Sequence, residues 1–529
     1  MMNKKIAAQL IVIALLTVSL IAITELRARP NSVFSKLALI TDVRDYLVRE
    51  YVEEPDQQEM MENAVRGMIA SLDDPYTNYI SQEEQESFET QITGSFTGIG
   101  AEVEIHQKRL RIVTPLEGSP AWKAGVLAGD IVMKIGEETT LDLSLYEAIS
   151  KLKGPKGTDV TITVRHKSGE QEELTITRDK INIKTARGFK RNEDHTYNFF
   201  LDDDNKIGYI RLTQFNKDTT KQTIEAITQL KDNNVKAIIL DLRFNPGGLL
   251  SSAVEISDLF LPEGQRIVST KGRVVPEIAY NASDRGTLVP DDISVVVIAN
   301  EASASASEIV TGALSDNGRA LFVGTRTYGK GSVQDIRDLA GNLGTLKYTN
   351  AYYYLPNGRN IHKREGKETW GVDPSEGCYV RMTPKQIEAM IEVRRETDVI
   401  LKDENTDAQP KVTPDWIENT LKDIQLAAAL EAALGKLETG NWPQVGESNV
   451  ELLVLESKRA NLEQRKLLLQ DTLDEIGNKI AELDDEINGL ASPATTSEDA
   501  QAAAHSTPAS DTASTEAPAP IASTTEPAE

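Results

Sequence analysis

Cysteine is nearly absent from this chain of 529 residues, in which Cys378 is the only one. A single thiol cannot form an intramolecular disulfide, and it cannot supply the Cys/His clusters that hold structural metals. Scarcity of thiols is also consistent with an oxidising compartment such as the bacterial cell envelope. The sequence therefore predicts domains that depend on apolar cores, without a metal site.

Positive charge is also in short supply. The chain has 57 Lys and Arg against 82 Asp and Glu, a net charge of −25, and its body contains no basic block. Such a chain lacks the basic surface that would neutralise phosphates, which excludes nucleic acid as a partner and argues against docking on anionic lipid by charge alone. Hydrophobic residues make up 40% of the chain, and its length predicts two to four domains.

The N-terminal stretch, residues 1–30, has the pattern of an export signal. Two lysines, Lys4 and Lys5, precede a mostly apolar run over residues 6–23. The run is near the lower limit for a membrane span, and no clean small-x-small cleavage site follows it. A cleaved signal and a retained anchor both fit, and the flank favours the anchor slightly. We therefore expect a bacterial envelope protein that is periplasmic, secreted or anchored.

Two regions follow. Residues 31–93 have apolar residues at helical spacing and predict an N-terminal helical cap. Residues 94–182 change to short strands and hairpins, and this region resembles a PDZ domain in its Gly98-Ile99-Gly100 loop, its segment 119–131 and the helix from Leu145. In PDZ domains a peptide C-terminus adds to a sheet edge and loop N–H groups hold its carboxylate. The resemblance gives this role to Gly98, Ile99 and Gly100; alternatively, the glycines only make tight turns.

Residues 183–375 predict the α/β core. Near-continuous apolar runs at 207–212, 237–242, 295–299 and 320–324 alternate with helical patterns, as buried strands between covering helices do. Residues 376–447 are mostly helical and acidic, and we expect them to pack on this core.

The last two regions have different compositions. In residues 448–490 one heptad position is apolar throughout, at Leu455 and every seventh residue up to Leu490. The companion position is interrupted by Arg459 and Lys466, so a coiled coil is predicted, irregular or with a different partner chain. The alternative is one amphipathic helix lying on its own domain. Residues 491–529 are mostly Ala, Pro, Ser, Thr and Glu and predict a disordered tail.

Three serines are candidate nucleophiles. Ser303, Ser305 and Ser307 alternate with alanines between a predicted strand and a predicted helix, where free N–H groups would favour an anionic transition state. An N-cap serine or tight small-residue packing would give the same pattern. The local sequence does not choose among the three.

Histidine, the usual base, is scarce. Of five histidines only His362 lies in a plausible region, and it has no obvious acidic partner. A lysine can replace histidine as the base if its pKa falls by ~3 units from about 10.4. Such a fall costs ~4 kcal/mol, which burial of the amine can supply. Lys330 lies between two glycines in an apolar and aromatic context, which limits water around the amine. Gln334 is four residues on, on the same side of a strand or a helix, and its amide oxygen could orient the amine.

Several segments together resemble the carboxy-terminal processing peptidases, also called tail-specific proteases, over roughly residues 35–435. The matching segments are 300–309 (NEASASASEI), 324–334 (GTRTYGKGSVQ), 74–77 (DPYT), 208–211 (GYIR), 241–248 (DLRFNPGG) and 371–374 (GVDP).

The resemblance assigns roles. It implies Ser305 as nucleophile, Lys330 as base and Gln334 as the residue that orients the base. It implies an oxyanion hole made by the N–H of Ala306 and by a glycine of the 245–248 loop, Gly248 in preference to Gly247. It also implies a PDZ domain that binds the substrate's C-terminus and blocks or opens the active site, and it implies no cofactor.

The expected fold is α/β and multidomain, with a crotonase/ClpP-like protease core, an inserted PDZ domain, helical N- and C-terminal parts and a C-terminal coiled coil. The expected function is an exported serine endopeptidase acting on polypeptides with free C-termini. We expect a homo-oligomer, and the coiled coil could dock an adaptor protein. A catalytically silent PDZ and coiled-coil scaffold is the alternative. An acyl-CoA enzyme is disfavoured, because no basic cluster for CoA stands out and an exported protein would meet no CoA.

Overall fold

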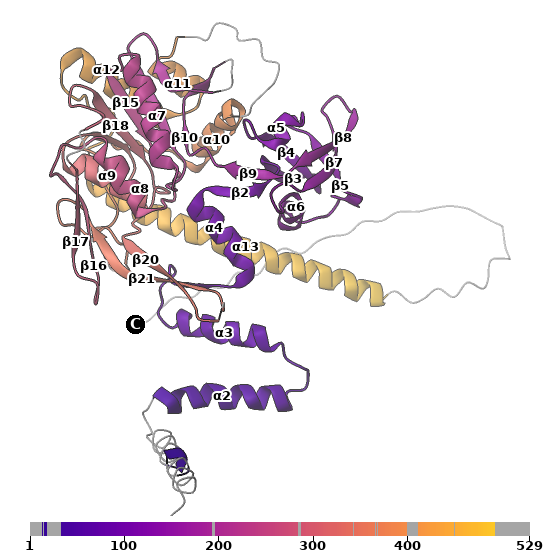
Figure 1. Cartoon of the computed structure of the whole chain (residues 1–529). Coiled ribbons are helices and arrows are strands. Elements are labelled where there is room, and N and C mark those ends of the chain that lie inside the picture. Colours follow the sequence, from indigo (N-terminus) through magenta and orange to yellow (C-terminus); the bar gives the residue numbers. More distant parts are fainter. Residues whose placement is uncertain are drawn as a thin grey trace, which may run out of the picture. The chain divides into compact units, whose positions relative to one another are not determined.

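The computed structural model describes residues 13, 15–17, 33–192, 196–283, 287–341, 343–364, 367, 369–398, 411–448 and 450–491. The chain divides into two compact units, Met1–Leu453 and Val454–Glu529, which are described separately (Figure 1). Most of the predicted export segment and nearly all of the predicted tail lie outside the described residues. Over the part that the structure describes, no helix is long and apolar enough to cross a membrane.

A six-stranded sheet forms the centre of the first unit, in the order β10-β14-β15-β18-β19 with β13 also paired to β14. Its strands are β10 (Ala186–Arg187), β13 (Phe200–Asp202), β14 (Ile207–Leu212), β15 (Ala237–Asp241), β18 (Ser294–Ala299) and β19 (Leu321–Gly324). From β14 to β19 the strands run parallel, and every residue of β14 and β15 is buried. Parallel strands covered on both faces require continuous apolar runs, and the predicted α/β core is confirmed.

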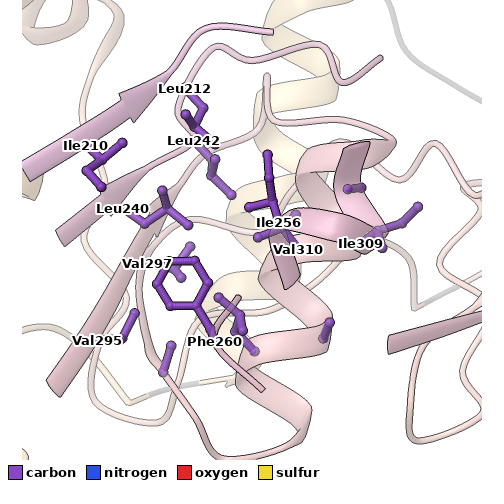
Figure 2. Packing of buried hydrophobic residues seen from close by; sticks show 14 of the residues in the cluster. Ile210, Leu212, Leu240, Leu242, Ile256, Phe260, Val295, Val297, Ile309 and Val310 are labelled. Atoms are coloured by element: carbon purple, nitrogen blue, oxygen red, sulfur yellow. The ribbon is translucent and has the colours of Figure 1, made fainter. Parts of the chain in front are cut away.

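Helices cover both faces of this sheet. One face packs against α7 (Thr219–Asp232), α8 (Leu250–Asp258) and α9 (Ala306–Asp316), and the other against α11 (Pro414–Thr420) and α12 (Ile424–Thr439). Successive strand residues divide between the faces, as the pleat requires: Leu240 belongs to the first cluster and Ile239 to the second. Figure 2 shows the first cluster, with Leu240 and Val297 facing Ile256 and Phe260. Helices α11 and α12 lie within residues 376–447, and they pack on the core as expected for this region.

A second, antiparallel sheet has the order β1-β21-β16-β17, and β20 also pairs with β21. Its strands are β1 (Asn78–Ile80), β16 (Arg266–Lys271), β17 (Ile278–Asn281), β20 (Ser332–Asp338) and β21 (Thr345–Tyr354). The predicted helical cap consists of α2 (Val33–Glu50), α3 (Gln57–Ala70) and α4 (Gln82–Thr93), together with β1. This three-residue strand was not predicted, because its pairing with β21 is a tertiary contact that no local periodicity reveals.

The PDZ-like region is a separate sheet in the order β3-β4-β5-β7-β8, with β6 on β5. Its elements are β3 (Ala101–His106), β4 (Arg109–Pro115), α5 (Pro120–Lys123), β5 (Ile131–Ile135), β6 (Glu138–Thr139), α6 (Leu145–Leu152), β7 (Asp159–Arg165) and β8 (Gln171–Thr177). It leaves and re-enters the rest of the chain through the pair β2 (Ser95–Gly98) and β9 (Asp179–Asn182), where Ser95 faces Asn182. Strand β3 is at the edge of the sheet, which leaves one side available for a further strand.

Four further elements complete the described chain: β11 (Lys190–Arg191), β12 (Tyr197–Asn198), α10 (Pro384–Asp398) and α13 (Val450–Ala491). Helix α13 is a single helix of 42 residues and covers the predicted coiled-coil region.

Candidate active site

The three candidate serines lie between β18 and α9, and they differ in their surroundings. The Ser303 hydroxyl donates to the Leu242 carbonyl at 2.8 Å, and the Ser307 hydroxyl donates to the Asn245 carbonyl at 2.9 Å. Both side chains are buried, and their hydrogen bonds attach the serine segment to the β15–α8 loop. Ser305 is only partly buried, and its hydroxyl donates to no described group. Of the three, Ser305 has the hydroxyl that is available to a substrate.

The backbone of Ser305 is strained. Its φ of 55° and ψ of −113° place a residue with a side chain in a region that glycine favours. In α/β-hydrolases a sharp strand-to-helix turn exposes the nucleophilic serine above its surroundings. The Glu308 carboxylate, one turn into α9, accepts the Ser305 N–H at 2.8 Å and holds the turn in place.

Glu308 also binds the segment that carries the candidate base. Its Oε2 accepts the Lys330 N–H at 2.8 Å, and its Oε1 accepts the Gly329 N–H at 2.7 Å and the Thr327 hydroxyl at 2.6 Å. Burial raises the pKa of this carboxyl, while these hydrogen bonds oppose the rise. One buried side chain therefore ties the serine turn to the lysine segment.

Tyr353, on β21, makes a second link between the same two segments. Its hydroxyl donates to the carbonyl of Lys330 and lies 3.2 Å from the carbonyl of Ser305. The ring is buried, so the link is fixed within the core.

The Lys330 side chain is partly buried, which limits the access of water to its amine. Burial lowers its pKa, and the positive charge of Lys347 lowers it further, against the attraction of Glu308 and Asp74. The Lys330 Nζ lies 4.9 Å from the centre of the Tyr76 ring. A lowered pKa is what a general base at moderate pH requires.

Tyr76 belongs to the matching 74–77 segment, but no role was predicted for it. The Asp74 carboxylate accepts the Tyr76 N–H at 3.0 Å and the Thr77 hydroxyl at 2.6 Å, which fixes the turn. The N–H of Thr349, on β21, donates to the Thr77 hydroxyl at 3.1 Å. The N-terminal region therefore supplies one wall of the lysine site.

The expected contact between Gln334 and Lys330 is not formed. The Gln334 amide donates to the hydroxyls of Ser332 at 2.9 Å and Thr349 at 3.3 Å, and across the described chain no hydrogen bond of the Lys330 amine is found. A register shift between Val333 and Gln334 disturbs the alternation of side chains that the prediction assumed.

His362 lies beside the site without an acidic hydrogen-bond partner. Its ring packs 5.1 Å from that of Tyr352 and 6.0 Å from that of Tyr76, measured between ring centres. Burial lowers its pKa, and Arg364 acts in the same direction. In the described chain its Nδ1 has no hydrogen-bond partner, so the support that orients a catalytic histidine is missing.

The glycine loop after β15 lies against the serine turn. A Cβ added to Gly247 would be 2.7 Å from that of Ser305, and one added to Gly248 would be 1.9 Å from the Phe215 carbonyl oxygen. The Gly247 N–H already donates to the Asn245 side chain at 2.9 Å. The N–H groups of Gly248 and Ala306 make no hydrogen bond with any residue described. Gly248 is therefore the better-suited partner for Ala306 in an oxyanion hole.

A buried ion cluster lies behind this loop. Arg243 pairs with Asp241 and Asp423, each at 2.6 Å, and Arg394 of α10 lies 3.1 Å from Asp423. Burial opposes ionisation of Asp241, but Arg243 outweighs it and holds the pKa of that carboxyl well below its usual range. The cluster joins the end of β15 to the start of α12. Asp423 was missed from the sequence because 180 residues separate it from Arg243.

The expected tail-binding residues line a separate cavity of about 890 Å³. Gly98, Ile99 and Gly100 border it, together with Ile149 and Leu152 of the PDZ-like sheet domain, whereas Ser305 does not. The N–H groups of Ile99 and Gly100 have no hydrogen-bond partner within the described ranges. This end of the groove could therefore accept an apolar residue and a carboxylate.

Comparisons with known proteins agree with this architecture. The family model "Peptidase family S41" matches residues 206–376, "PDZ domain" matches residues 111–166, and "Activating protease CtpB N-terminal domain" matches residues 18–84.

Individual relatives match the chain over a longer stretch than the peptidase family model does. A "Carboxy-terminal-processing protease" of Bartonella bacilliformis is 37% identical over 336 residues, 63% of this chain and 74% of that protein. A "Probable CtpA-like serine protease" of Staphylococcus aureus is 33% identical over 340 residues, 64% of this chain and 65% of that one. A solved photosystem II D1 C-terminal processing protease is 28% identical, with 67% of this chain and 90% of that chain covered and a TM-score of 0.38. The chain belongs to the S41 family of carboxy-terminal-processing serine peptidases and carries a PDZ domain.

Proposed function

We propose that this chain is an exported endopeptidase that binds the free C-termini of polypeptides through its PDZ domain and cleaves them with Ser305 and Lys330. The observation that carries the proposal is Glu308, whose buried carboxylate holds both the strained Ser305 turn and the Lys330 segment. The partly buried amine and the free Ser305 hydroxyl are the chemical pair that a Ser–Lys peptidase needs.

The chemistry follows from these groups. Neutral Lys330 takes the hydroxyl proton as the Ser305 oxygen attacks the peptide carbonyl carbon. The N–H groups of Ala306 and Gly248 donate to the resulting oxyanion. The intermediate collapses, Lys330 returns the proton to the departing amine, and an acyl-enzyme remains. Water, deprotonated by Lys330, then releases the new C-terminus and restores Ser305.

Gln334 has a supporting role in this proposal. Its amide oxygen would accept a hydrogen bond from the Lys330 amine once the side chain turns from Ser332 and Thr349. An amide would orient the base without adding a negative charge that raises its pKa.

Substrate recognition is assigned to the cavity beside β3. The substrate tail would add to the free edge of β3, its last side chain would enter the apolar end near Ile149 and Leu152, and its carboxylate would meet the free N–H groups of Ile99 and Gly100. No cofactor takes part in this chemistry. A crotonase/ClpP-like arrangement of the core, as the resemblance implies, belongs to the same proposal.

Ser305→Ala tests the assignment, with Ser303→Ala and Ser307→Ala as matched controls. Cleavage of an unfolded protein with an apolar C-terminus should fall at least about a thousandfold in Ser305→Ala, with tail binding intact. The control variants should lose about 1 kcal/mol of stability each and keep substantial activity. Equal proteolysis by wild type and Ser305→Ala would overturn the proposal, and absence of cleavage by the wild type would favour a silent scaffold.

A further inference from the structure

The C-terminal half of α13 has an uncovered apolar stripe. The side chains of Leu469, Leu473, Ile476, Ile480, Leu483 and Ile487 are each 49–61% exposed. They follow one another at alternating intervals of four and three residues, so that every second one is seven residues further on, which is the repeat of a left-handed coiled coil. A stripe with this repeat is covered best by another helix with the same repeat.

The charges beside the stripe favour a second copy of the same helix in parallel. In a parallel, in-register pair, the residue that precedes Lys466, Leu473 or Ile480 lies close to the partner residue five positions further along the chain. This rule places Lys479 opposite Asp484 of the second copy, twice by symmetry, and Arg465 opposite Gln470. Between residues 465 and 487 these flanking positions create no pair of like charges, whereas Lys466 faces its own copy among the apolar layers.

The antiparallel arrangement is less favourable. With the six apolar layers matched, Leu469 would pack against Ile487 of the other copy and Leu473 against Leu483, and Lys479 would then lie beside Lys479 of the other copy. This like-charge contact lies on the two-fold axis of the pair, and like charges at such positions destabilise a coiled coil.

Two cations, Arg459 and Lys466, occupy the same heptad position as Leu473, and they favour a coil of two strands over one of three or four. Arg459 is exposed and pairs with Glu463 of its own helix at 2.8 Å, and Lys466 is also exposed. In a two-stranded coil such long side chains can run along the seam and keep their charges in water, whereas a larger bundle would enclose them.

We propose that α13 pairs with α13 of a second copy as a parallel, in-register, two-stranded coiled coil. The inference does not depend on the proposed chemistry. A helix of 42 residues extends about 63 Å, so the coil would join two chains along that length and both would enter it from the same end.

Introduced cysteines test the pairing in the full chain. The native thiol of Cys378 is 1% exposed and will not interfere. Under mild oxidation Ile487→Cys should form a disulfide-linked dimer, because a parallel pair places both residues in one layer. Asp485→Cys, on the outer side of the same turn, is the matched control and should stay monomeric on a non-reducing gel.

The opposite orientation has its own signature. An antiparallel pair with the apolar layers matched separates the two copies of residue 487 by about 27 Å and places residue 487 opposite residue 469 of the partner. A disulfide between tagged Leu469→Cys and untagged Ile487→Cys chains, without the Ile487→Cys homodimer, would overturn the parallel pairing. Absence of every crosslink would overturn the pairing itself.

A charge reversal tests the register. Lys479→Glu places two acidic residues opposite each other and should slow the Ile487→Cys crosslink about tenfold at low salt. Adding Asp484→Lys restores opposite charges and should restore the rate. Equal rates in all three proteins would contradict the in-register contact between residues 479 and 484.

Discussion

At the scale of single residues, Glu308 connects the two candidate catalytic residues through their backbones. Glu308→Gln keeps the size of the side chain but replaces one acceptor oxygen with an NH₂ group that faces N–H donors. We expect a loss of about 1–3 kcal/mol in the free energy of unfolding. We also expect kcat to fall more than tenfold with little change in KM, because the serine and lysine segments separate while the substrate-binding groove is untouched.

Steady-state kinetics and urea unfolding measure these effects. Glu255→Gln, an exposed position on α8, is the control for removing a carboxylate and should change neither quantity. A Glu308→Gln enzyme with wild-type kcat would show that this link is unnecessary for the alignment.

Tyr76 gives a second prediction at this scale. Burial lowers the Lys330 pKa, so kcat/KM should rise with pH along a limb that lies below the ordinary lysine value of 10.5. Tyr76→Ala admits water to the ammonium group, raises its pKa and moves the limb to higher pH. Water should outweigh the lost ring–cation attraction, which is about 0.5–1 kcal/mol at exposed sites.

The control for this prediction is Tyr76→Phe, which keeps the ring over the amine and should keep the wild-type pH profile. Stability has a related sign. Because the folded pKa lies below the unfolded one, protonated Lys330 destabilises the fold, and this cost disappears as pH rises through the folded pKa towards 10.5. A limb that moves to lower pH in Tyr76→Ala would mean that the ring stabilises the charged amine.

Part of this site could be predicted from the sequence. The lack of a supported histidine predicted a lysine base, and the family resemblance selected Ser305 among three equivalent serines. The structure adds a physical difference, since the hydroxyls of Ser303 and Ser307 bind carbonyls of the neighbouring loop. Glu308 and Tyr76 were not predicted, because their contacts join segments that are distant in the chain.

At the scale of elements, the loop after β15 depends on Asn245. Its amide donates to the Leu212 carbonyl at 2.8 Å, and its side-chain oxygen accepts the Gly247 N–H. Asn245→Asp replaces the donor with an oxygen that repels the carbonyl. We expect a loss of about 2–4 kcal/mol of stability and a fall in kcat, because the loop carries the Gly248 N–H.

Asn317→Asp is a matched control at the other end of α9. Its amide also donates to two carbonyls, at 2.7 and 2.8 Å, but it has no contact with the glycine loop. It should reduce stability and leave kcat of the folded enzyme unchanged. If both variants lose kcat equally, the effect of Asn245 is general and does not act through the loop.

Elements differed in how well the sequence predicted them. The parallel strands β14, β15, β18 and β19 could be predicted from continuous apolar runs, because a strand buried on both faces has apolar residues at successive positions. Strand β1 and the irregular start of β20 could not, because each is fixed by its pairing with β21. Gln334 lies at this irregular start of β20, where its amide donates to Ser332 and Thr349 and the predicted contact with Lys330 is not formed.

At the scale of the whole molecule, the two compact units predict how a truncated chain behaves. Among the described residues, the three apolar core clusters and the side chains packed on them include none beyond Val445. Removal of residues 449–529 should therefore shift Tm of the first unit by less than about 2 °C and leave cleavage of a short peptide unchanged. Calorimetry and a peptidase assay on both chains check this. A larger fall in Tm would mean that the C-terminal helix stabilises the protease core directly, and that α13 is then unavailable to pair with a second copy.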